Sequence, residues 1–287
     1  LVMIGPDVTD EDLTRLYAEE AIDPKRIRQV ADDVREDLTF LAKRAGAPML
    51  MGLNSEVVDR SNARRFNTAV LIEPDGQLSP PYHKIHLVPW GEYLPLSKWL
   101  PWLHLLTPHA SANYGIDSGT EAVRFRWNGY SFGVLICFED TLPWAARVYA
   151  RTDPVQILVN ISNDGWFGVC DDADTSVGLL RRAQHEAHLA ISVFRAVECR
   201  RPLVRAVNTG VSAIIDSSGR IVRATGDETG KPELASDVVT GEIPLDDRES
   251  LYVRSGDWLA ILCLVTTVAL LCARAAMSIR RLSRSPS

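Results

Sequence analysis

Cysteine is scarce and scattered in this sequence. The five cysteines form no Cys-x-x-Cys pair and lie far apart: Cys137, Cys170, Cys199, Cys263 and Cys272. An odd number at such spacings argues against a disulfide framework and against a zinc site of the usual ligand spacing. No motif implies a metal ion or an organic cofactor.

The sequence also lacks repeats and several common binding motifs. The sequence has no internal repeat, no low-complexity stretch and no glycine-rich loop of the kind that cradles phosphate groups. Its main body has no basic patch suited to nucleic acid, so we expect no nucleic-acid partner. The chain begins at Leu1, inside an apolar run and without an initiator methionine. We therefore expect it to be the C-terminal part of a longer protein.

The composition that is present is ordinary for a globular protein. With 287 residues, 46% of them apolar and 24% charged, the chain is long enough for one large α/β domain or two small ones. The net charge of −6 is unevenly distributed, because residues 274–287 hold four arginines and no acid and leave −10 on the rest of the chain.

A long uncharged run, "WLAILCLVTTVALLC", precedes this basic tail. Trp258 to Ala273 is 16 residues, somewhat short of the roughly 20 that a spanning helix needs. The following residues can lengthen the helix if Arg274 extends its charge to the interface. We predict a transmembrane helix over residues 256–277 and a basic tail over 278–287; a buried core helix is the alternative. The positive-inside rule puts the tail in the cytoplasm and the acidic body on the other side.

The rest of the chain mixes helix-like and strand-like segments. Thr9 is a plausible N-cap, and a helix is predicted from Pro24 to Ala45, ending at Gly46. Further helices are expected over residues 141–150 and 179–199. The strand-like runs are "PMLMGL", "TAVLIEPDG", "AVRFRW", "FGVLICF", "VQILVNIS", "RPLVRAVNT", "SAIIDSSG" and "DVVTGEI". Many strands with a few helices between them predict a layered α/β sandwich.

The stretch "VLICFED", residues 134–140, places a cysteine at the end of a buried strand. In open α/β sheets this is the end at which catalytic side chains gather. Cys137 is thus a candidate nucleophile, although a lone cysteine in an apolar run is more often a small buried hydrophobe.

Two other stretches place polar residues just after strand-like runs. "YHKIHLVPWGEYLP" holds Lys84 and Glu92, and "LVNISNDGWFG" holds Asn163 and Trp166. A cysteine nucleophile that attacks an acyl group needs a cation to hold the oxyanion, which Lys84 can supply, and Glu92 can keep that ammonium oriented. Taken singly, Lys84 is more often a solvated loop lysine and Glu92 a surface acid.

Together these motifs resemble the carbon–nitrogen hydrolase (nitrilase) superfamily, whose catalytic set is glutamate, lysine and cysteine in that order. "KIHLVPWGEYLPL", "ICFED", "NISNDGWFG", "FRAVECRRPLVRAVNTGVSAIID" and the terminal apolar helix look more narrowly like the apolipoprotein N-acyltransferases. The likeness runs from about Pro48 to the C-terminus. It implies a nitrilase-like αββα sandwich over residues 1–255, held in the periplasm at the bacterial inner membrane between transmembrane helices, of which the terminal helix is the last.

The resemblance also implies roles for single residues. Cys137 would take an acyl chain from a phospholipid as a thioester and pass it to the α-amine of the diacylglyceryl-cysteine of an apolipoprotein. Lys84 and a backbone N–H near Phe138 would hold the oxyanion, Glu92 would hold Lys84, and Glu139 would be a supporting acid at the mouth of the site. The expected substrate-binding residues are Trp90, Phe138, Asn163 and Trp166.

One family feature is absent from the chain. The catalytic glutamate normally ends an early strand in a Trp-Pro-Glu motif, and the nearest analogue here is "IGPD", which ends at Asp7. Aspartate is one methylene shorter, so we expect the glutamate to lie before Leu1; Glu19, Glu20 and Glu56 are poorer candidates. Two alternatives stay open, namely an amide or nitrile hydrolase that uses water, and a degenerate nitrilase-like binding module.

Overall fold

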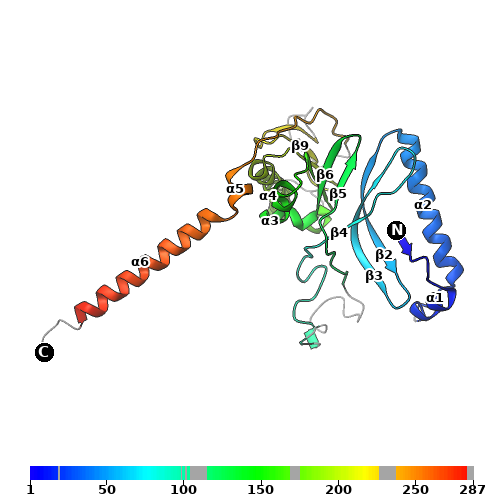
Figure 1. The fold of residues 1–287 in the computed structure, drawn as a ribbon, viewed down its shortest axis with the longest axis horizontal. Coiled ribbons are helices and arrows are strands. Elements are labelled where there is room, and N and C mark those ends of the chain that lie inside the picture. The colour runs from blue at the N-terminus through cyan, green and yellow to red at the C-terminus, as the bar shows by residue number, and fades with distance from the viewer. Residues whose placement is uncertain are drawn as a thin grey trace.

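Two stacked β-sheets between outer helices make the main body, and one long helix extends away from it (Figure 1). The structure is a computed structural model that describes residues 1–18, 20–97, 99–100, 102–103, 115–168, 175–225 and 237–282, with side chains up to residue 277.

The first sheet has four strands in the order β1-β2-β3-β4. They are β1 (Val2–Ile4), β2 (Met49–Val58), β3 (Ala63–Ile72) and β4 (Tyr82–His83). β2 and β3 pair antiparallel over ten residues, whereas β1 runs parallel to the end of β2. Helices α1 (Asp10–Leu16) and α2 (Pro24–Ala45) lie on the outer side of this sheet (Figure 1).

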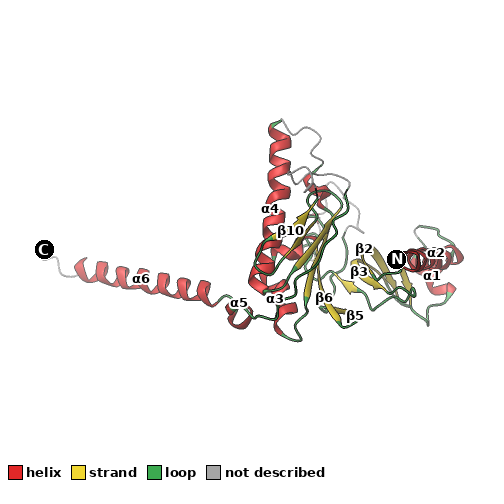
Figure 2. Cartoon of the chain, turned by 90° about the horizontal axis from the view of Figure 1, so that it is seen from above, coloured by secondary structure: helices red, strands yellow, loops and turns green. Residues whose placement is uncertain are grey.

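The second sheet has six strands in the order β10-β9-β8-β7-β6-β5. They are β5 (Arg124–Trp127), β6 (Tyr130–Ile136), β7 (Ile157–Ser162), β8 (Leu203–Val207), β9 (Ala213–Ile215) and β10 (Ile221–Ala224). β6, β7 and β8 are parallel, so their C-terminal ends meet at one edge. Helices α3 (Pro143–Arg151) and α4 (Ser176–Cys199) cover the outer face of this sheet (Figure 2), followed by the short α5 (Leu251–Ser255).

The inner faces of the two sheets form a shared apolar core. Leu71 and Tyr82 of the first sheet belong to one buried cluster with Val134, Ile136 and Val159 of the second. A second cluster fills the space between the second sheet and α3 and α4. Two sheets between two helical layers are the predicted αββα sandwich.

Local signals in the sequence account for the first helices. Thr9 caps α1 in a capping box with Asp12. In α2, Asp23 accepts a hydrogen bond from the Lys25 N–H, and Gly46 ends the helix with a left-handed φ of 61°. The predicted bounds of α2 are confirmed.

One predicted strand is wrong. Residues 237–243, "DVVTGEI", form no strand in the structure. The edge of β9 is instead paired with β10, which follows after a tight turn in which the Asp216 N–H donates to the Arg220 carbonyl. A strand joined by a short turn loses less chain entropy on pairing than a distant segment, so the local hairpin takes this edge.

The terminal helix α6 (Trp258–Leu282) contains an apolar span of 20 residues, Trp258–Met277. None of this span is buried against the rest of the described chain, so the alternative of a buried core helix is wrong. Residues 283–287 of the predicted basic tail lie outside the described residues.

Candidate active site

Cys137 begins a sharp turn at the C-terminal end of β6. Its φ of 51° lies in the left-handed region that non-glycine residues seldom adopt, and it opens the 3₁₀ turn Cys137–Thr141. The residue is half-buried. The Asn160 side-chain N–H groups donate to the Leu135 carbonyl at 3.2 Å and to the Cys137 carbonyl at 3.4 Å. The strained turn is thus tied to the neighbouring strand β7.

A second cysteine shows the contrast. Cys199, at the end of α4, is buried, and burial raises the pKa of its thiol to about 12. A thiol that stays protonated at neutral pH is a poor nucleophile. Among the described cysteines of the sandwich, Cys137 is therefore the one suited to covalent chemistry.

Lys84 and Glu92 form an ion pair beside this turn. The Lys84 side chain is fully buried, and its Nζ donates to both carboxylate oxygens of Glu92 at 2.8 Å. The Val88 N–H donates to Glu92 Oε2 at 2.8 Å, which fixes the carboxylate. The pair holds the ammonium charge of Lys84 in one position inside the protein.

Glu139 connects the lysine segment to the cysteine turn. Its carboxylate accepts hydrogen bonds from the N–H groups of Ile85 and His86 at 2.9 and 3.0 Å, and from that of Ile136 at 2.8 Å. The Tyr82 hydroxyl donates to the same carboxylate at 2.8 Å. Glu139 is completely buried, so its predicted place at the mouth of the site is wrong. The carboxylate lies where these backbone N–H groups converge, and it ties the segment after β4 to the turn that begins at Cys137.

Cys137 lines two cavities that differ in polarity. The first, here called the apolar cavity, has a volume of about 550 Å³ and includes Pro89, Trp90, Phe138, Trp166, Phe167 and Ile191. Trp90 and Trp166 also reach the surface, with exposed fractions of 56% and 73%. An apolar cavity with exposed tryptophans at its mouth suits a hydrocarbon chain that enters from a lipid phase.

The second cavity, here called the amide cavity, has a volume of about 620 Å³. Its wall includes Cys137, Glu92 and four asparagines: Asn54, Asn67, Asn163 and Asn208. Asn163 and Trp166 line both cavities. The structure thus places the predicted Glu92, Cys137, Trp90, Phe138, Asn163 and Trp166 on the walls of these two cavities. Lys84 lines neither cavity and is joined to the site through its ion pair with Glu92.

A buried polar cluster lies beneath the two strand ends. Arg205, in β8, donates to Asp164 at 2.5 Å and to Asp140 at 3.4 Å. His188, in α4, lies 2.9 Å from Asp140 and 3.1 Å from Asp164, and the Ser192 hydroxyl donates to Asp140 at 2.7 Å. All five residues are buried. We call them the Arg205 cluster.

The charges of the Arg205 cluster compensate one another. Burial alone lowers the pKa of His188, but its hydrogen bonds to Asp140 and Asp164 outweigh this and raise it to about 9. Burial likewise tends to raise the pKa of Asp164, yet His188 and Arg205 hold it below its usual value. His188 therefore carries a positive charge at neutral pH and, together with Arg205, faces the carboxyl groups of Asp140 and Asp164. Since Asp140 follows β6 and Asp164 follows β7, the cluster fixes both loops that border Cys137.

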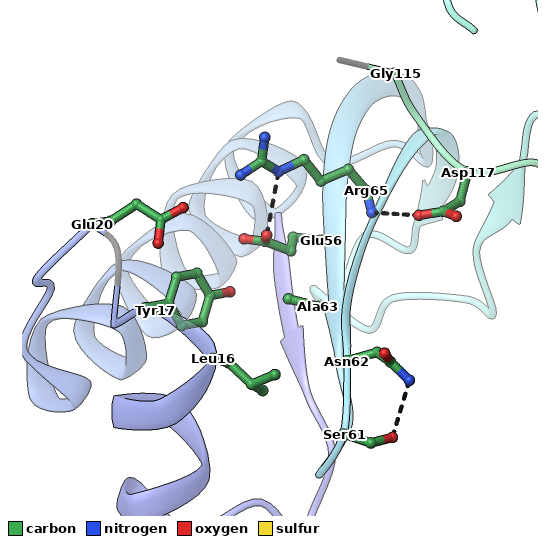
Figure 3. Close-up of a pocket in the computed structure, with 10 residues that line it drawn as sticks. All are labelled: Leu16, Tyr17, Glu20, Glu56, Ser61, Asn62, Ala63, Arg65, Gly115 and Asp117. Atoms are coloured by element: carbon green, nitrogen blue, oxygen red, sulfur yellow. Dashed lines mark hydrogen bonds and ion pairs between the residues drawn. The ribbon is translucent and has the colours of Figure 1, made fainter. Parts of the chain in front are cut away.

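A polar surface hollow lies elsewhere, at the outer end of the first sheet (Figure 3). Glu20, Glu56 and Tyr17 line it, and Arg65 forms a 3.5 Å ion pair with Glu56. Cys137 is not among its lining residues. Glu20 and Glu56 thus belong to a different surface from the nucleophile.

Asp7 is not placed to replace the missing glutamate. Its carbonyl accepts a hydrogen bond from Arg60, at the turn between β2 and β3, and Asp7 lines neither cavity. The cavity wall is formed instead by residues 52–54, nearer the middle of β2. Glu19 lies outside the described residues. Of the described carboxylates, Glu92 and Asp164 alone line either of these two cavities, and the glutamate expected before Leu1 stays a prediction.

Comparison with known proteins supports the assignment made from these motifs. The model of the carbon-nitrogen hydrolase family matches residues 14–252. The chain belongs to this family. The predicted resemblance to carbon–nitrogen hydrolases is confirmed.

Among curated proteins, this carbon–nitrogen hydrolase chain is similar to the apolipoprotein N-acyltransferase of Geobacter metallireducens. The two are 37% identical over 226 residues, which cover 78% of this chain and 38% of that protein. Apolipoprotein N-acyltransferase 1 of Treponema denticola is 29% identical over 256 residues, covering 83% of this chain and 43% of that protein. The chain thus spans less than half the length of these relatives.

A solved structure confirms the fold. The carbon-nitrogen hydrolase from Helicobacter pylori G27 aligns with a TM-score of 0.51 and 16% sequence identity, over 69% of this chain and 65% of that one. At this identity the likeness concerns the nitrilase-like sandwich alone.

Sequence reasoning missed most of the Arg205 cluster in this carbon–nitrogen hydrolase chain. One signal was available, because "RPLVRAVNT" places an arginine inside a strand-like apolar run, and a charged residue in a core strand must have buried partners. Asp140, directly after Glu139, is one of them. His188 and Ser192 gave no sequence signal that sets them apart from an ordinary helix.

Proposed function

We propose that this chain carries the catalytic domain of an apolipoprotein N-acyltransferase, which moves a fatty acyl chain from a phospholipid to the α-amine of the diacylglyceryl-cysteine of an apolipoprotein. The observation that carries the proposal is the position of Cys137 between an apolar cavity and an amide cavity. A thiol so placed can hold a hydrocarbon chain on one side and meet a polar partner on the other. The matched relatives of that name support this function.

In the first half-reaction the Cys137 sulfur forms a bond to the sn-1 ester carbonyl carbon of the phospholipid. Lys84 and a backbone N–H near Phe138 stabilise the negative oxygen of the tetrahedral intermediate, while Glu92 keeps Lys84 in place. The ester C–O bond then breaks, and the thiol proton leaves on the hydroxyl of the lysophospholipid. The acyl chain stays in the apolar cavity as a thioester.

In the second half-reaction the α-amine of the acceptor attacks the thioester carbonyl carbon. The C–S bond breaks, an amide bond forms, and the proton lost by the amine returns to the sulfur of Cys137. Each cycle therefore consumes one ester and one amine, and it produces one alcohol and one amide without a redox change.

The alternative of a soluble amide or nitrile hydrolase fits the surface less well. Trp90, Trp99 and Trp166 are exposed by 56%, 83% and 73%, and the apolar span of α6 is unburied. Exposed apolar surface on this scale is typical of contact with a membrane or a partner. In a hydrolase, water would resolve the acyl-enzyme and free fatty acid would accumulate without any acceptor.

We expect Cys137 to be the residue that becomes acylated. The test is the intact mass of the full-length protein, purified from membranes and incubated with phospholipid in the absence of acceptor. The wild-type protein should gain a fatty-acyl mass that hydroxylamine removes, and Cys137→Ala should gain none. Cys199→Ala is the matched control and should be acylated like the wild type, because that thiol is buried and protonated. A wild-type protein without any adduct would favour the degenerate binding module.

We further propose that α6 crosses the bacterial inner membrane, with the basic tail in the cytoplasm and the sandwich outside it. The apolar span has 20 residues, and at about 1.5 Å per residue this matches a hydrocarbon core of about 30 Å. The arginines that follow agree with the positive-inside rule.

Two aspartates in the middle of α6 are expected to abolish membrane retention of the 287-residue chain. Each acidic residue at the centre of a span costs about 2.5–3.5 kcal/mol, so Leu264→Asp/Val268→Asp should shift the chain from the pellet to the supernatant after alkaline carbonate washing. The control is Phe40→Asp/Leu41→Asp, which places the same charges on exposed positions of α2 and should leave the chain in the pellet. Equal retention of both variants would contradict a spanning α6.

A further inference from the structure

The amide cavity is built from two pairs of asparagines that face it from different sheets. Asn54 of β2 and Asn67 of β3 lie directly opposite each other in the antiparallel register, and both line the cavity. Asn163 follows β7 and Asn208 follows β8, and they form the second pair. Cys137 lines the same cavity, so a ligand held by these amides shares that cavity with the reacting sulfur.

The two pairs differ in the hydrogen bonds that their side chains make. The Asn208 Nδ2 donates to Asn163 Oδ1 at 2.7 Å, and Asn208 Oδ1 accepts from the Asp164 N–H at 3.0 Å. This second pair is therefore part of the fixed wall. The side-chain amides of Asn54 and Asn67 make no hydrogen bond within the described part of the chain. Their donors and acceptors are available to a ligand.

The chemistry of the wall decides what kind of ligand fits. A carboxamide offers N–H donors and a carbonyl acceptor together, which is the pattern that a peptide group presents in return. The described residues that line the amide cavity include no Lys, Arg or His. Phosphate groups in proteins are held by such cations, so the headgroup of a phospholipid is poorly matched here.

We infer that the amide cavity holds the peptide backbone of the acceptor, that is, the residues that follow its lipidated cysteine, with Asn54 and Asn67 as the binding side chains. The inference rests on the proposed acyl transfer and assigns the two sides of Cys137 to different substrates. The donor chain occupies the apolar cavity first, and the acceptor peptide enters from the amide cavity. The two substrates then reach opposite sides of one thioester.

The test measures the two half-reactions separately in the full-length protein, with Asn54→Ala and Asn67→Ala. Thioester formation on Cys137 from phospholipid in detergent micelles should stay within twofold of the wild type. Transfer from the preformed thioester to a diacylglyceryl-cysteine tetrapeptide should fall about 3- to 10-fold for each variant, through a higher KM, because each loses hydrogen bonds to the peptide. Asn62→Ala, in the turn between β2 and β3, is the matched control and should leave both steps unchanged.

A second acceptor, which lacks the residues after the lipidated cysteine, tests whether the effect depends on contacts with the peptide. Diacylglyceryl-cysteine amide has the attacking amine but no following residues, so the variants and the wild type should acylate it equally well. Unchanged transfer to the tetrapeptide would overturn the inference, and so would slower thioester formation in the variants, which would assign the cavity to the donor. Normal thioester formation also demonstrates that a variant is folded. A wild-type protein that forms no thioester would instead refute the proposed function.

Discussion

A Lys84→Met variant is expected to form the Cys137 thioester about 10²–10³-fold more slowly than the wild type, which is the usual effect of removing one oxyanion donor. Lys84 is fully buried and its Nζ is held by both oxygens of Glu92 at 2.8 Å. The position of its positive charge is thus set before the reaction begins. A methionine side chain has a similar length but carries no charge that could stabilise the oxyanion. A time course of the acyl-enzyme mass after mixing with phospholipid measures the rate.

The matched control for this prediction is Lys43→Met. Lys43 is an exposed residue in the last turn of α2, on the outer layer of the sandwich, and its replacement should leave the rate unchanged. A thermal melt of each variant separates a loss of chemistry from a loss of fold. A folded Lys84→Met protein with a rate within threefold of the wild type would remove Lys84 from the oxyanion site.

Replacing Arg205 by methionine is expected to lower the free energy of unfolding by about 3–5 kcal/mol, as found when one partner of a buried ion pair is removed. Arg205 is buried between Asp140 and Asp164. Without it, two buried carboxylates share the single positive charge of His188. Thermal unfolding of the detergent-solubilised protein should show the loss as a midpoint lowered by more than about 5 °C.

The control uses the same substitution at a surface ion pair. Arg182 lies 3.0 Å from Glu186, with the two side chains 45% and 59% exposed, and exposed pairs contribute about 0–1 kcal/mol. Arg182→Met should therefore shift the midpoint by no more than a few degrees. If the two variants melt alike, the Arg205 cluster does not hold the loops after β6 and β7 together.

Much of the fold was predictable because its signals are local. The apolar, β-branched run before Cys137 predicted β6, and the strand end then predicted a candidate nucleophile. Asp23, Pro24 and Gly46 predicted both ends of α2. The strand predicted over residues 237–243 failed because pairing also depends on which sheet edge is free, and β10 takes that edge.

The site was predictable only in part. Lys84 and Glu92 were singled out by their loop and by the family resemblance, and the structure joins them as an ion pair. Glu139 was predicted at the mouth and lies buried instead, because Ile85, His86 and Ile136 direct their N–H groups at it from two separate segments. No local sequence pattern predicts that N–H groups from these two segments meet at one carboxylate.

The sequence by itself determined most of the strands and helices, the position of Cys137 at a strand end, the long apolar span of α6 and the family. These depend on residues a few positions apart, so periodicity and capping encode them. Only the tertiary structure decided the Arg205 cluster and the two cavities. Arg205 and Asp140 are 65 positions apart in sequence, and Asn54 reaches the wall of Cys137 through the packing of one sheet on the other. Such contacts follow from strand order and register, which bring distant residues together only after the chain has folded.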